Sequence, residues 1–91
     1  MLIIGRMEFL GPLKPSQLKS EPGILALLRK GERGISLLEV GQFESVACAA
    51  ERWDGNVHLY AVCYTPGLDP IQRQLICEDI SREAAVNANY L

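Results

Sequence analysis

The sequence predicts one small α+β domain, in which a three-stranded antiparallel sheet is flanked by helices. The first observation is length, since 91 residues suit a single domain with a modest core. The second is the alternation of short β-rich stretches with stretches whose apolar residues recur at helical spacing. The third is the placement of glycine, proline and aspartate between them, where chains turn. Together these features are typical of a layered α+β domain.

The first 22 residues are predicted to be an extended lead that precedes a core over residues 23–91. They contain three prolines, which lack the backbone N–H that strands and helix interiors use. One helical turn, from Pro15 to Lys19, is expected within this lead. The three strands of the sheet are therefore expected to come from the core alone.

A β-hairpin is predicted at the start of the core. The run GILALLRK (residues 23–30) is apolar for most of its length, as in a strand covered on both faces. The turn GERG (residues 31–34) has a glycine at each end, and ISLLEV (residues 35–40) supplies the returning strand. Gly41 then breaks the strand.

A helix, a third strand and a second helix complete the predicted order. Ser45 can cap a helix that ends at the turn DGN (residues 54–56). The next stretch, VHLYAVCY (residues 57–64), has strong β character. Asp69-Pro70 is a typical helix start, with Gln72 at the capping-box position, and the last helix is expected to run to about residue 86.

Composition and charge indicate where the protein acts. The chain is 48% apolar with a net charge of -2, which is the wrong sign for a surface that binds DNA as a whole. No apolar run is long enough for a membrane span or a signal peptide. The three cysteines lack the spacing of a metal site and are expected to be reduced thiols. A cytoplasmic protein that binds no membrane is therefore predicted.

PGILALL is followed by LLEVGQFESV, a strand, TPGLDPIQR and a final helix. In this arrangement the chain resembles the GIY-YIG nuclease superfamily, from about residue 7 to residue 91. The two signatures would fall on Gly23-Ile24-Leu25 and Glu39-Val40-Gly41. The resemblance implies a compact three-stranded antiparallel sheet with flanking helices. It also implies phosphodiester cleavage by a metal-bound glutamate, a helix arginine and two tyrosines.

The catalytic groups of that family are missing at the matching positions. Leu25 and Glu39 stand where the resemblance implies tyrosines, Ala49 stands at the arginine, and Cys77 stands at the metal-binding glutamate. The resemblance therefore implies a cleft that has lost its chemistry. The residues of this candidate cleft are Leu25, Glu39, Ala49, Trp53, Arg73, Cys77 and Asn89.

The leading hypothesis is a catalytically inactive GIY-YIG-like domain that serves as a binding or regulatory module, without a metal or other cofactor. The acidic balance favours a protein partner. A nucleic acid is a weaker alternative, through the only tight basic group in the sequence. That group consists of Arg29, Lys30 and Arg33.

Two other functions fit the same sequence. The first is a divergent endonuclease that cleaves DNA with Mg²⁺ or Mn²⁺ and uses Glu39, Arg52 and Glu78 as its catalytic residues. The second is an unrelated small α+β interaction protein. The sequence leaves the oligomeric state open.

Overall fold

Strand β3 (Gly23–Gly31) lies inside the sheet, because it pairs with a neighbouring strand on each side. The computed structural model describes residues 2–5, 7–32, 34–52 and 59–87, with side chains described as far as Glu83. The strands in these residues are β1 (Leu2–Ile4), β2 (Met7–Leu13), β3 (Gly23–Gly31), β4 (Gly34–Phe43) and β5 (Leu59–Tyr64). The helices are α1 (Val46–Arg52) and α2 (Pro70–Asn87), and a 3-10 turn, η1, spans Pro15–Gln17.

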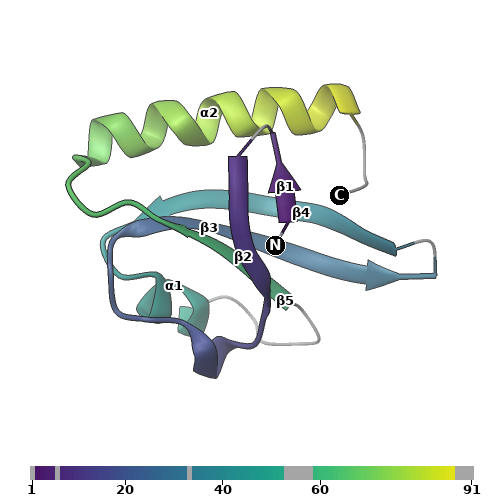
Figure 1. The fold of residues 1–91 in the computed structure, drawn as a ribbon, viewed down its shortest axis with the longest axis horizontal. Helices are drawn as coiled ribbons and strands as arrows, with labels where there is room; N and C mark the ends of the chain where they lie inside the picture. Colours follow the sequence, from purple (N-terminus) through teal and green to yellow (C-terminus); the bar gives the residue numbers. More distant parts are fainter. Residues whose placement is uncertain (1, 6, 33, 53–58, 88–91) are drawn as a thin grey trace.

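The five strands form an antiparallel half-barrel in the order β1-β2-β5-β3-β4 (Figure 1). The prediction of a three-stranded sheet was therefore wrong. The three strands that were predicted are present as β3, β4 and β5, and β3 pairs with both of the others. The additional strands, β1 and β2, come from the expected lead. Their pairing is driven by burial, since Ile4 and Phe9 are almost completely removed from solvent. Pro12 is tolerated because it lies between Leu10 and Leu13, where the β2–β5 register shifts.

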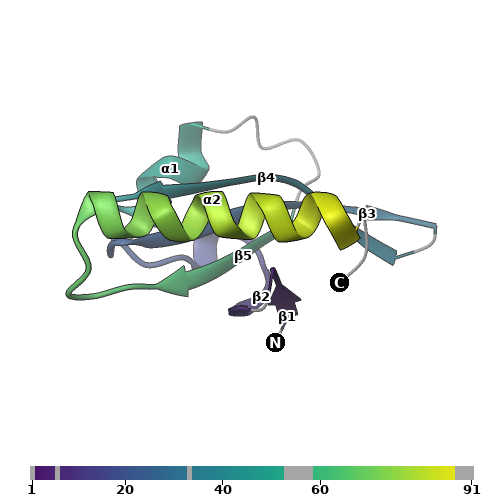
Figure 2. The same ribbon diagram turned by 90° about the horizontal axis from the view of Figure 1, so that it is seen from above.

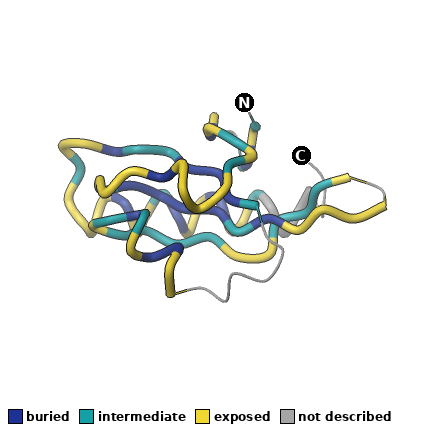
Figure 3. The backbone as a smooth tube through the Cα atoms, turned by 90° about the horizontal axis from the view of Figure 1, so that it is seen from below, coloured by how far each residue is buried: buried dark blue, intermediate teal, exposed yellow. Residues whose placement is uncertain are grey.

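Each face of the sheet has its own apolar cluster. One cluster lies between α2 and the sheet and contains Ile24 and Ala26, and the other lies between α1 and the sheet and contains Leu25. Strand β3 contributes to both because successive side chains of a strand point to opposite faces. Helix α2 lies along one face, over β3 and β4, whereas α1 and η1 cover the opposite face (Figures 1 and 2). The buried parts of the chain accordingly run through the middle of the sheet, and the end of the β3–β4 hairpin is exposed (Figure 3).

The predicted starts of both helices are confirmed by their caps. The hydroxyl of Ser45 accepts a hydrogen bond from the Cys48 N–H at 3.4 Å. Ahead of α2, the Asp69 carboxylate accepts the Gln72 N–H at 2.8 Å, and the Gln72 side chain accepts the Asp69 N–H at 3.0 Å. This reciprocal pair is a capping box, which satisfies two of the amides that a helix start leaves unpaired.

Candidate functional site

The sheet separates the residues of the predicted cleft. Leu25 of β3 and Ala49 of α1 are both buried in the apolar cluster between α1 and the sheet. Arg73 and Cys77 are also buried, but on α2 at the opposite face. Glu39 is exposed on β4. Two further residues of the predicted cleft lie outside the described residues, namely Trp53 and Asn89.

The residues of the alternative nuclease site also come from different faces. Arg52 is exposed at the end of α1, and Glu78 is exposed on α2, so the sheet lies between them. Within the described ranges, no group of three or more His, Cys, Asp or Glu residues is placed to hold a metal ion. Of the basic group near the hairpin turn, Arg29 and Lys30 are exposed, whereas Arg33 lies outside the described residues.

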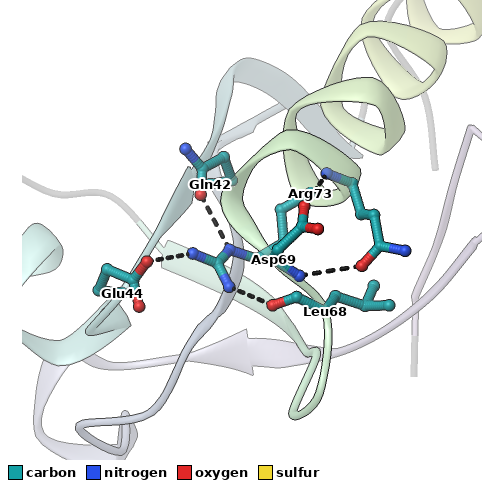
Figure 4. A network of polar contacts seen from close by, with 6 residues as sticks. Gln42, Glu44, Leu68, Asp69 and Arg73 are labelled. Carbon is teal, nitrogen blue, oxygen red and sulfur yellow. Dashed lines mark hydrogen bonds and ion pairs between the residues drawn. The ribbon is translucent and has the colours of Figure 1, made fainter.

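Arg73 forms a buried polar centre that joins β4 to α2 (Figure 4). Its side chain is only 2% exposed, and it donates hydrogen bonds from Nε to Gln42 Oε1 at 2.9 Å and from Nη1 to the Leu68 carbonyl at 2.7 Å. Its Nη2 donates to Glu44 Oε1 at 2.6 Å, and the Glu44 side chain is 73% exposed. The planar guanidinium thus holds the end of β4 and the loop before α2 in a single arrangement.

The thiol of Cys77 is neutral in the folded protein. The pKa of Cys77 is raised from 9.0 to about 11, mainly by burial, while the positive charge of Arg73 lowers it and the negative charge of Glu78 raises it. Because the thiolate is the form that attacks electrophiles, the buried thiol of Cys77 is a weak nucleophile at neutral pH. Its sulfur instead contributes to the apolar cluster between α2 and the sheet.

At about pH 8, a disulfide reagent is expected to modify Cys77 about a hundredfold more slowly than an exposed cysteine. The reason is that the raised pKa leaves almost no Cys77 thiol in the reactive thiolate form. The measurement is the labelling rate of a chain that keeps Cys77 and carries Cys48→Ser and Cys63→Ala. A chain that keeps only Cys48, which is exposed, serves as the matched control. Rapid labelling of Cys77 without denaturant would contradict its burial.

A groove between β4 and α2 is the candidate binding site. It encloses about 450 Å³ between the edge strand of the sheet and one side of the helix. Its apolar floor is formed by Val40, Gly41 and Cys77. Its polar rim is formed by residues of α2, namely Gln74, Glu78, Ser81 and Arg82.

Strand β4 has a free edge beside this groove. It pairs with β3 on one side, and no other described strand pairs with it. Five consecutive residues, Glu39 to Phe43, pair with β3 in regular register. Before them the register shifts, so that Leu38 is an extra residue between the partners of Leu27 and Leu28. Such a bulge interrupts the ladder, so the regular free edge next to the groove begins at Glu39.

The sequence did not predict this groove, although all three of its floor residues stand at positions of the GIY-YIG resemblance. Val40 and Gly41 belong to the second signature, and Cys77 stands at the metal-binding glutamate. The local sequence contains no signal that β4 is an edge strand, because this depends on the pairing order of the whole sheet.

Comparisons of this chain with protein-family models, with curated proteins and with solved structures found no match. The resemblance to the GIY-YIG superfamily therefore stays a prediction from the sequence. None of the helices in the described ranges has the length and apolar character needed to cross a membrane.

Proposed function

We propose that this chain is a protein-binding module that takes up an extended segment of a partner protein along the free edge of β4. The observation that carries the proposal is the free edge of a regular strand next to a groove with an apolar floor. An edge strand presents unpaired N–H and C=O groups, which an added strand satisfies. Alternate side chains of the added strand then enter the neighbouring groove, as in other cases of recognition by strand addition.

The groove is also well supported from within the protein. Arg73 ties Gln42 and Glu44, at the end of β4, to the start of α2. Val40 packs against the apolar cluster beneath α2, which anchors the middle of the strand. A site held in its binding geometry loses less conformational entropy when it binds a ligand. These contacts therefore favour a preformed site for an extended backbone.

The proposal agrees with the protein partner that the acidic composition predicts, and it requires no metal or other cofactor. It does not depend on the GIY-YIG resemblance. The three cysteines are free thiols, which supports the cytoplasmic location proposed from the sequence.

The proposal is tested with peptides selected on the purified chain from a random phage-displayed library. Each selected peptide is added to the isotope-labelled chain, and amide chemical-shift changes are recorded. We expect the largest changes at residues 39–43 and 74–82, because strand addition gives the free amides of β4 new acceptors. Changes concentrated elsewhere, or a library without any binding peptide, would contradict the proposal.

A matched pair of variants separates the groove from the rest of the surface. Ser81 lies on the groove rim and is exposed, whereas Ser16 is exposed on η1, on the opposite face of the sheet. Ser81→Trp is expected to weaken peptide binding by about tenfold or more, because its ring occupies the groove. Ser16→Trp adds the same ring elsewhere and is expected to leave the affinity unchanged.

A further inference from the structure

We infer that Glu78 selects the partner segment by pairing with a lysine or arginine that lies next to an apolar residue of that segment. This inference rests on the proposed function, because it assigns a preference to the same groove. It follows from the charges along the groove rim, the nature of the floor and the geometry of a strand.

Glu78 is the charge on the groove rim that the described protein leaves without a partner. Among the described residues that line the groove, Arg82 is the only cation, and it already donates a hydrogen bond to Asp79 at 2.9 Å. Glu78 forms no hydrogen bond or ion pair with any described residue. Glu39 does not contribute to this rim, because it pairs with Leu27 and lies on the opposite face of the sheet from its neighbour Val40. The rim is therefore complementary to a cationic side chain.

The floor of the groove favours an apolar side chain of the partner segment. Val40, Gly41 and Cys77 offer no charged atom, and the thiol of Cys77 is held neutral by burial. An apolar side chain that enters here removes apolar surface from water without a desolvation cost for charge. Side chains at alternate positions of a strand lie on the same face. The fitting segment therefore has an apolar residue and a basic residue two positions apart.

A second copy of this chain is a poor occupant of the groove. If two copies paired through β4 about a two-fold axis near Gly41, both Glu78 side chains would face the shared edge. Like charges placed close together in a sheet are destabilising. The charge pattern therefore favours a segment of another protein.

The test compares three versions of one selected peptide, which carry lysine, glutamine or glutamate at the basic position. Affinities are measured by calorimetry for the unchanged chain and for Glu78→Lys. We expect the unchanged chain to bind the lysine peptide about tenfold or more tightly than the glutamate peptide. Glu78→Lys is expected to reverse this order. Glu51→Lys makes the same charge change at an exposed position of α1, on the opposite face of the sheet, and is expected to keep the original order.

The outcomes distinguish the inference from the proposed function. If peptides bind along β4 but Glu78→Lys leaves their order unchanged, the role of Glu78 is wrong and the binding module stands. If no selected peptide binds the groove, both are wrong. A dimer in sedimentation that Ser81→Trp dissociates would show that a second copy fills the groove, and would overturn the inferred partner. Because Glu78 is exposed, equal unfolding temperatures of the variants serve as the control for folding.

Discussion

Replacing Arg73 with alanine is expected to lower the free energy of unfolding by about 2–5 kcal/mol. The substitution removes a long buried side chain and leaves a cavity between α2 and the end of β4. It also leaves the Leu68 carbonyl and the Gln42 side chain without the hydrogen bonds that Arg73 donates. Urea denaturation followed by circular dichroism measures the loss.

Two further variants identify the origin of this effect. Arg73→Met keeps most of the side-chain volume but donates no hydrogen bond, and its expected cost is about 1–3 kcal/mol. Glu44→Gln removes the charge of the partner, and its expected cost is below about 1 kcal/mol because exposed ion pairs contribute little. The Glu44 side chain is 73% exposed, so water already surrounds most of the carboxylate of this ion pair. A Glu44→Gln chain as unstable as Arg73→Ala would show that the ion pair itself dominates.

Replacing Gly5 with alanine is expected to lower the free energy of unfolding by about 2–4 kcal/mol, through backbone strain and overpacking. Gly5 lies in the turn between β1 and β2 at φ 55°, a conformation that disfavours a side chain. An added Cβ would also stand 2.9 Å from the Ile80 Cα and 3.2 Å from the Ile80 carbonyl oxygen. Both contacts are with the backbone of α2, so the turn or the helix has to move.

Gly67→Ala is the matched control for this substitution. Gly67 also has a positive φ, of 91°, but nothing lies within 4 Å of the position of its Cβ. Its expected cost is therefore only the conformational strain, about 1–2 kcal/mol. Equal losses in the two variants, measured by urea denaturation, would show that the contact between the β1–β2 turn and α2 is not tightly packed.

Local signals in the sequence were sufficient to predict most elements of the core. The apolar run and the two glycines of the hairpin predicted residues 23–30 and 35–40 as strands, and β3 and β4 are Gly23–Gly31 and Gly34–Phe43. The capping box at Asp69 predicted the start of α2, which spans Pro70–Asn87. These signals act over a few residues, because turns, caps and apolar periodicity are properties of neighbouring positions.

The same local rules failed at the N-terminus. Proline was interpreted there as a sign of an extended lead, but Phe9 is fully buried and β2 pairs with β5, about fifty residues further along the chain. The alternation of Met7 and Phe9 with the exposed residues Glu8 and Leu10 was the available signal, and it is short. Whether such a stretch joins a sheet is decided by a partner strand that lies far away in the sequence.

The sequence by itself determined the α+β class, the central hairpin and the ends of the last helix. Only the tertiary structure decided that Arg73 is buried, because its partners Gln42 and Glu44 are about thirty residues away. The pattern of α2 obscures this burial, since Ile71 and Leu75 are exposed on the same helix. The tertiary structure likewise decided that β4 is an edge strand with a groove beside it. Sheet order and side-chain burial arise from contacts between distant segments, and no short stretch of residues encodes them alone.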